Sequence, residues 1–129
     1  MHKNKIHQLS VIALLIVPMG VLASEVKIIN YTDSKAHVYF RGKGKTHHSI
    51  VTLAPKGMNE SVSTHQVLRE QVENAPLFEA IASTGSKGDP DWKLLAGTCA
   101  NLEIDKNYTL LIEPSLQSLK TSCTVINKE

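Results

Sequence analysis

The chain has 129 residues, of which 42% are hydrophobic and 20% are charged, and its formal net charge is +2. This length fits one domain with a modest core and excludes a multidomain protein. Removing Lys3 and Lys5 leaves 12 basic side chains, which equals the 12 acidic ones. A balanced domain argues against nucleic-acid binding, because neutralising phosphates requires an excess of Lys and Arg.

The first 23 residues have the layout of a secretory signal peptide. Two lysines precede an apolar run from Val11 to Leu22, and the small residues Ala23 and Ser24 follow it. The run is shorter than the roughly 20 apolar residues that a stable membrane anchor needs. We therefore expect a signal peptide over 1–23 and a mature domain over 24–129 that has no membrane span and is periplasmic or extracellular. A retained N-terminal anchor is the alternative. The short, Lys-rich start favours a bacterial source.

Cys99 and Cys123 are the only two cysteines. Exported chains with an even number of cysteines usually pair them, so we predict one disulfide. Its loop of about two dozen residues predicts a stabilisation of about 3 kcal/mol. The alternative is a free catalytic thiol, which needs a neighbouring His that neither cysteine has in the sequence.

After Ser24, apolar and polar residues alternate with a period of two, which indicates β-strands. The polar cluster over 30–34 ends the first strand, because Asn, Asp and Ser favour tight turns by bonding to their own backbone. Residues 36–41 alternate between one buried and one exposed face, as in antiparallel sheets. In chain order, the predicted strands are 26–30, 36–41, 49–53, 77–83, 92–99, 108–113 and 119–126.

Residues 61–75 are ambiguous. The sequence over 63–66 fits a helical capping box, and Val67, Leu68 and Val72 follow at helical spacing. This pattern favours a short helix over 63–75 that crosses between sheets. An edge strand is the alternative.

Strands of this number and spacing predict an all-β domain, with at most one short helix. Its expected architecture is an antiparallel Greek-key sandwich of two sheets, immunoglobulin-like, with one disulfide. The segment from Leu102 to Leu110 resembles the tyrosine corner of immunoglobulin-like and fibronectin type III sandwiches. There a Leu enters the core six residues before a Tyr whose hydroxyl bonds to the backbone, so the resemblance assigns these roles to Leu102 and Tyr108. It covers about nine residues and implies an architecture only.

The predicted hairpin over 36–53 gathers basic side chains around its turn, namely Arg41, Lys43, Lys45, His47 and His48. On a neutral domain this local positive charge is expected to contact an acidic protein, a sulfated glycan or a lipid phosphate. Our first hypothesis is therefore a small exported module that binds a protein or a cell-surface component. The alternative is a solvated turn whose Lys and Gly residues keep the hairpin soluble and prevent edge pairing.

Two histidines of the same hairpin lead to a second hypothesis, periplasmic Cu or Zn binding. If Tyr39 faces His48, then His37 and His48 lie on a cross-strand diagonal, with about 7–8 Å between their Cα atoms. Two imidazoles at that spacing can share one ion. The spacing shows no third ligand, although His65 or an acidic side chain is a candidate. Apart from this ion, no cofactor is expected.

Motifs of known enzymes are absent from the sequence, including the nucleophile elbow and the zinc-peptidase helix. Asp89-Pro90-Asp91 is typical of a turn, with a Ca²⁺ ligand pair or a glycosidase carboxylate pair as the alternative. We therefore expect a protein that is not an enzyme. An enzyme inhibitor or a small hydrolase is the third hypothesis, which stays open because a triad assembled from distant residues leaves no motif.

Overall fold

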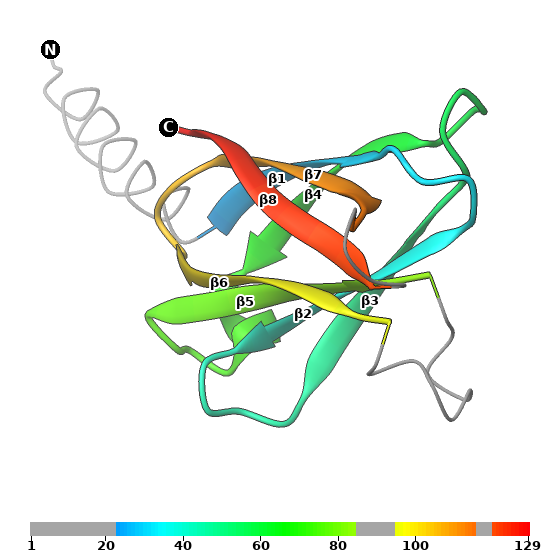
Figure 1. Ribbon diagram of the computed structural model, residues 1–129. Coiled ribbons are helices and arrows are strands. Elements are labelled where there is room, and N and C mark those ends of the chain that lie inside the picture. Colours follow the sequence, from blue (N-terminus) through cyan, green and yellow to red (C-terminus); the bar gives the residue numbers. More distant parts are fainter. Residues whose placement is uncertain (1–22, 85–94, 116–119) are drawn as a thin grey trace, which may run out of the picture.

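The computed structural model describes residues 23–84, 95–115 and 120–129, and within these ranges it contains eight strands and one 3-10 helix (Figure 1). The elements are β1 (Ala23–Asn30), β2 (Ala36–Gly42), β3 (His48–Leu53), β4 (Val62–Leu68), η2 (Arg69–Val72), β5 (Leu77–Ser83), β6 (Gly97–Glu103), β7 (Tyr108–Pro114) and β8 (Thr121–Lys128). One sheet has the strand order β4-β1-β7-β8 and the other has the order β3-β2-β5-β6. The predicted two-sheet sandwich is confirmed, whereas an immunoglobulin-like architecture stays a prediction.

One strand pair departs from the predicted antiparallel arrangement. β1 and β7 run parallel, with Val26 opposite Tyr108 and Asn30 opposite Ile112. All other strand pairs in the described residues are antiparallel. The parallel pair arises because the chain enters β7 from β6 in the other sheet, not through a hairpin from β1.

The core lies between the sheets and is built by the alternation of apolar residues along each strand. Phe78 lies at its centre, where its ring makes edge-to-face contacts with Phe40 and Tyr108 at centroid distances of 6.4 and 6.5 Å. The other large, fully buried apolar side chains are Val26, Ile28, Val38, Leu53, Val67, Val72, Leu102, Leu110 and Ile112. Side chains from both sheets thus form one continuous apolar layer.

The helix predicted over 63–75 is wrong for most of its length. β4 pairs antiparallel with β1 from Ala23 opposite Leu68 to Ile29 opposite Val62, so the edge-strand alternative is confirmed there. Only the four residues of η2 are helical, and Glu73 and Asn74 follow with φ of 55° and 60°. Pairing with a neighbouring strand therefore overrides the helical spacing of the sequence, as tertiary contacts commonly do.

The strand predicted over 92–99 is displaced toward the C-terminus. β6 begins at Gly97 and continues through Glu103, past a register shift opposite Phe78 and Ala80. Asn101 has φ of 58° at this bulge, which allows the strand to stay paired with β5. Residues 85–94 lie outside the described residues, and with them the predicted turn at 89–91 and Trp92.

The connection from β6 to β7 confirms the predicted corner. The hydroxyl oxygen of Tyr108 accepts a hydrogen bond of 2.7 Å from the backbone N–H of Glu103. Leu102 and Tyr108 are both buried. This contact fixes the crossing between the two sheets.

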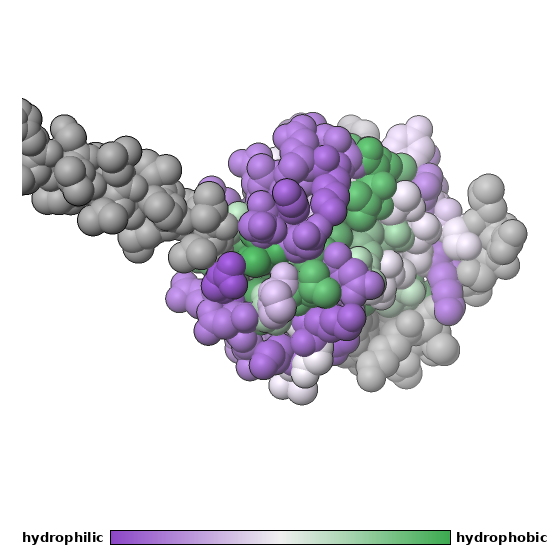
Figure 2. All heavy atoms as spheres, turned by 90° about the vertical axis from the view of Figure 1, so that its left-hand side faces the viewer, coloured by the Kyte–Doolittle hydropathy of each residue, from purple (hydrophilic) through white to green (hydrophobic). Residues whose placement is uncertain are grey.

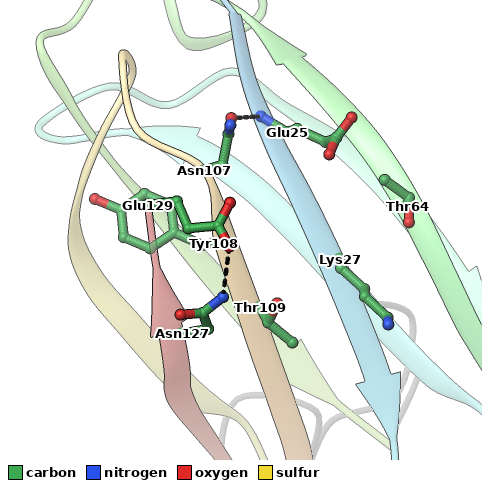
Figure 3. Close-up of a pocket in the computed structure, with 8 residues that line it drawn as sticks. All are labelled: Glu25, Lys27, Thr64, Asn107, Tyr108, Thr109, Asn127 and Glu129. Carbon is green, nitrogen blue, oxygen red and sulfur yellow. Dashed lines mark hydrogen bonds between the residues drawn. The ribbon is translucent and has the colours of Figure 1, made fainter.

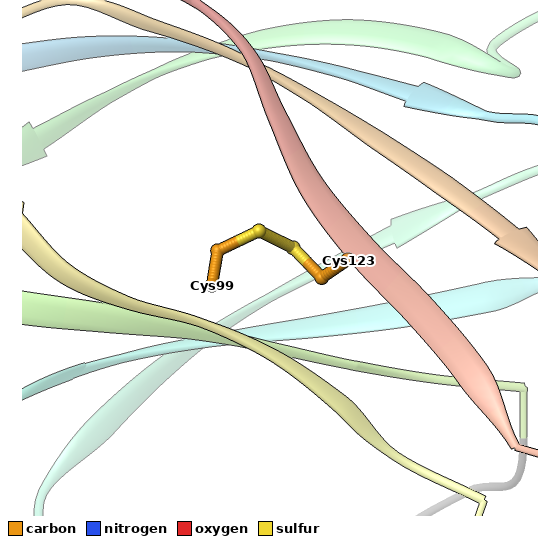
Figure 4. Close-up of a disulfide and its surroundings, with 2 residues drawn as sticks. All are labelled: Cys99 and Cys123. Atoms are coloured by element: carbon orange, nitrogen blue, oxygen red, sulfur yellow. A yellow bond between two sulfur atoms is a disulfide. The ribbon is translucent and has the colours of Figure 1, made fainter.

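The predicted disulfide is also confirmed. Cys99 of β6 and Cys123 of β8 are joined, with their Cα atoms 5.4 Å apart (Figure 4). Since β6 and β8 are edge strands of different sheets, the bond closes one side of the sandwich.

Asn30 organises the turn between β1 and β2 from inside. Its Nδ2 donates hydrogen bonds of 2.9 Å to the backbone oxygens of Ser34 and Ala54. Its Oδ1 accepts hydrogen bonds from the backbone N–H and the hydroxyl of Thr32, at 3.1 and 2.8 Å. The predicted polar turn is therefore confirmed, and its central side chain is buried.

Candidate contact site at the β2–β3 turn

The turn between β2 and β3 consists of Lys43–His47, all of which are exposed. The N–H of Lys45 donates to the oxygen of Gly42 at 2.9 Å, and Gly44 has φ of 78°, which favours glycine. Figure 2 shows the end of the sandwich that carries this turn, where hydrophilic residues cover most of the surface. The turn thus presents its side chains to solvent.

The base of the turn packs closely on η2 and the residues that follow it. A Cβ atom on Gly42 would lie 2.2 Å from the oxygen of Val72 and 2.9 Å from the Cβ of Ala75, so only glycine fits. The N–H of Lys43 donates to the oxygen of Leu77 at 2.9 Å, and the N–H of His47 donates to Oε2 of Glu73 at 3.2 Å. Contacts with residues that are distant in the sequence therefore hold both ends of the turn.

The predicted basic residues differ in how their charge is balanced. Nε of Arg41 donates to Oε2 of Glu79 at 2.8 Å, and its Nη2 contacts the same oxygen, so a carboxylate offsets this charge. Nζ of Lys43 donates to the neutral Oδ1 of Asn101 at 3.1 Å. Lys45 extends from the same exposed turn. The positive charge at this end therefore lies mainly on the two lysines.

The two histidines beside the turn have different surroundings. His47 is exposed, while His48 is partly buried and lies edge-on to the ring of Tyr39, at a centroid distance of 5.2 Å. Tyr39 is only 4% exposed although it lies on the outer face of its sheet, where it pairs with Ile50 and Ile81. His48 therefore packs against the sheet, and His47 belongs to the contact surface.

The structure does not place His37 and His48 on the predicted diagonal. His37 pairs with Thr52 and His48 pairs with Arg41, so the register differs by two residues from the one that sets Tyr39 opposite His48. The difference lies in the turn, which takes five residues, Lys43–His47, and is closed by the bond from the N–H of Lys45 to the oxygen of Gly42, so the strands pair two residues away from the predicted register. Because His48 lies opposite Arg41, it is displaced from His37 by four residues along the strand direction, which is roughly 13 Å.

His65 does not join these two histidines, because it lies on β4 in the other sheet. Its Nε2 forms a hydrogen bond of 2.9 Å with Oγ of Ser63, and its burial lowers the pKa of the imidazole. Within the described residues, no cluster of three or more His, Cys, Asp or Glu side chains is arranged to hold a metal ion. Metal binding through His37 and His48 stays a prediction.

A polar pocket on the outer face of the other sheet had no signal in the sequence, because its residues come from four distant segments. It has a volume of about 160 Å³ (Figure 3). Two hydrogen bonds line it, from the N–H of Glu25 to Oδ1 of Asn107 at 2.9 Å and from Nδ2 of Asn127 to Oε2 of Glu129 at 3.1 Å. The remaining lining residues are Lys27, Thr64, Tyr108 and Thr109. None of the eight is a His or a Cys, so the pocket offers neither an imidazole base nor a thiol nucleophile.

Comparisons with known proteins bear on the fold alone. No family model matches the sequence, and no curated protein matches it. An NMR structure of a protein from Eubacterium rectale is similar, with a TM-score of 0.51 and 12% identity over 84% of this chain and 92% of that one. The crystal structure of listeriolysin O aligns with a TM-score of 0.37 and 16% identity, over 81% of this chain and 23% of that chain. In the described ranges no helix is long and apolar enough to cross a membrane.

Proposed function

We propose that residues 24–129 form an exported binding module whose β2–β3 turn contacts an acidic protein or an anionic component of the cell surface. The observation that carries this proposal is the fixed position of the turn: Gly42 and His47 anchor its two ends, while Lys43 and Lys45 extend into solvent. A surface that is ordered before binding loses little conformational entropy when a partner arrives.

The charge pattern defines which residues would make the contact. Glu79 offsets the charge of Arg41, so Arg41 positions the end of the strand. Lys43, Lys45 and His47 then form the contact surface, and His48 supports it from the side of Tyr39. Positive side chains at an exposed turn accelerate the approach of an acidic partner and lose influence as salt increases.

Export is supported by the signal-like start of the sequence and by the disulfide, because such bonds persist in oxidising compartments. Cleavage after Ala23 leaves Ser24 as the first residue. Its buried hydroxyl donates to the backbone oxygen of Lys106, which would hold the new terminus in place. Mass spectrometry of the protein from its producing cell should therefore show a chain that begins at Ser24 and lacks two hydrogens. A cytoplasmic, full-length chain would contradict export.

The contact itself is tested with Lys43→Glu/Lys45→Glu. The matched control is Lys35→Glu/Lys56→Glu, which changes the net charge equally at the opposite end of β2 and β3. The probes are immobilised heparin and the cell-envelope fraction of the producing organism. We expect the turn variant to bind at least about tenfold more weakly at low salt, while the control stays close to the unmodified protein. Equal losses for both variants would show that net charge alone governs binding and would contradict a site at the turn.

A further inference from the structure

The four edge strands of the sandwich differ in how open they are to further pairing. β6 has the bulge at Asn101, and β8 has an extra residue, Ile126, between the pairs that it forms with Leu110 and Thr109. Bulges on an edge hinder the addition of another strand. β3 and β4 pair with β2 and β1 without any register shift. These two edges are therefore regular.

β4 carries none of the features that usually protect an edge. Its seven residues, Val62 to Leu68, include no Lys, Arg, Asp, Glu or Pro. Val62 and Leu68 are 48% and 37% exposed, at opposite ends of the strand. A regular, uncharged edge with apolar residues is typical of strands that pair with another chain.

The backbone of β4 also directs hydrogen-bonding groups outward. The N–H of Asn30 donates to the oxygen of Ser61 at 2.8 Å, so Ser61, Ser63, His65 and Val67 direct their groups toward β1. Val62, Thr64 and Gln66 then direct theirs away from the sheet. The N–H of Leu68 follows the same pattern and is bonded to Oε1 of Gln71 at 2.9 Å.

We propose that β4 pairs antiparallel with β4 of a second copy of this chain, about a twofold axis at His65. The pairing sets Thr64 opposite Gln66 of the second copy, and both residues have outward backbone groups. Two four-stranded sheets then become one continuous eight-stranded sheet. This inference goes beyond the proposed function and is independent of the β2–β3 turn.

Side-chain chemistry favours the second copy as the occupant. The pairing sets the exposed Val62 of each chain against Leu68 of the other, which buries both. Lys27 lies opposite Thr64, and Glu25 lies opposite Gln66, on the outer face (Figure 3). Each row across the joined sheet therefore carries one Lys27 and one Glu25, three strand spacings or roughly 14 Å apart, so the row is balanced in charge without a direct ion pair.

The β3 edge lacks this complementarity. Arg41 lies opposite His48, and His37 lies opposite Thr52. A β3 strand paired with its own copy about Ile50 would join Arg41, His48 and His37 of the second copy in one row, which is three basic positions. The β4 pairing joins only the two His65 imidazoles, whose pKa is lowered by burial. The comparison of the two edges therefore singles out β4.

The same geometry limits the assembly to two chains. After pairing, the outermost strands of the joined sheet are the two copies of β8, each with its bulge. A twofold interface uses the same patch on both chains and closes on itself. The product is a dimer and not a fibre.

A set of single-cysteine variants tests the register. At the axis the two His65 positions form a non-hydrogen-bonded pair with Cα atoms about 4.5 Å apart, which a disulfide can span. His65→Cys should therefore yield a covalent dimer under mild oxidation. Ser63→Cys is the matched control on the same face, and its copies lie roughly 13 Å apart along the strands, so it should stay uncross-linked. Efficient cross-linking through Thr64→Cys or Gln66→Cys instead would overturn the stated register.

Sedimentation of the unmodified mature protein tests the pairing without altering His65. A two-strand interface is small, so we expect a weak, reversible dimer that forms as the protein concentration rises toward about 1 mM. Thr64→Pro removes an outward N–H that the sheet does not use, so the variant should keep its circular dichroism and become monomeric. Ile50→Glu on the β3 edge should still dimerise. A protein that is monomeric at the highest concentration, or a dimer that Thr64→Pro leaves intact, would overturn the proposal.

Discussion

The two turns that flank β2 are held in opposite ways. In the turn from β1, the buried Asn30 bonds to Thr32, Ser34 and Ala54, so polar side chains are used to satisfy the turn's own backbone. The turn to β3 is held mainly at its ends, through Gly42 and His47, and its side chains stay exposed. One turn is thus built for stability, while the other leaves its polar side chains available to a partner.

This difference shows where stability and contact chemistry separate in a small sandwich. A buried amide with all its hydrogen bonds made is difficult to replace, because each unmet partner costs free energy. An exposed lysine contributes little to the folded state and tolerates substitution. Variants in the two turns should therefore separate loss of folding from loss of binding.

The largest effect is expected for Asn30→Ala. It removes four hydrogen bonds and leaves the oxygen of Ala54 and the N–H of Thr32 without that partner, while the Thr32 hydroxyl still donates to the oxygen of Ser34, so we expect a loss of about 2–4 kcal/mol in the free energy of unfolding. Urea denaturation followed by circular dichroism measures this. The control is Asp33→Ala in the same turn, whose side chain is 87% exposed and which should change stability by less than about 0.5 kcal/mol. Similar losses for both variants would contradict the central role of Asn30.

The next largest effect is expected for Gly42→Ala, at the base of the other turn. The added Cβ would meet the backbone oxygen of Val72, so the strand or η2 must shift, at a cost of about 2–3 kcal/mol. Gly44→Ala is the control, because no atom lies within 4 Å of its added Cβ. Its φ of 78° alone should cost about 1 kcal/mol. If thermal unfolding shows that Gly44→Ala destabilises the protein more than Gly42→Ala does, the base of the turn is not fixed.

Features that depend on neighbouring residues were predicted from the sequence. The strands follow from alternation, the turn at Asn30 follows from its polar cluster, and the corner follows from the spacing of Leu102 and Tyr108. The disulfide prediction required only that the chain contain two cysteines and a start that resembles a signal peptide. Each of these features is encoded within a short segment or by a single possible pairing.

Features that depend on distant contacts were not predicted. The base of the β2–β3 turn packs on Val72, which lies 30 positions from Gly42 in the sequence. β4 has a sequence compatible with both a helix and a strand, and pairing with β1 decides between them. The ion pair in which Glu79 balances the charge of Arg41 likewise joins two strands, β5 and β2. The candidate site was thus predicted as a group of residues but not in its charge balance.

A smaller effect is expected for Glu73→Ala, which removes the side-chain oxygen that accepts the N–H of His47. Since the contact is exposed, we expect a loss of no more than about 1 kcal/mol. The local effect should be clearer, because hydrogen exchange at the His47 amide should accelerate while exchange in β1 stays unchanged. Glu70→Ala, in the first turn of η2, serves as the control for the loss of one carboxylate. Unchanged exchange at His47 would mean that Glu73 does not hold this end of the turn.

The smallest effect on folding is expected for Lys43→Glu/Lys45→Glu, the variant that should most weaken binding. Both residues are exposed, and among the described residues their side chains make one hydrogen bond, from Lys43 to Asn101. The free energy of unfolding should therefore change by less than about 0.5 kcal/mol. Denaturation and binding should be measured on the same preparation, so that the changes in stability and in affinity can be compared directly. If the free energy of unfolding of this variant falls by several kcal/mol, the two lysines stabilise the fold, and any loss of binding reflects unfolding of the turn.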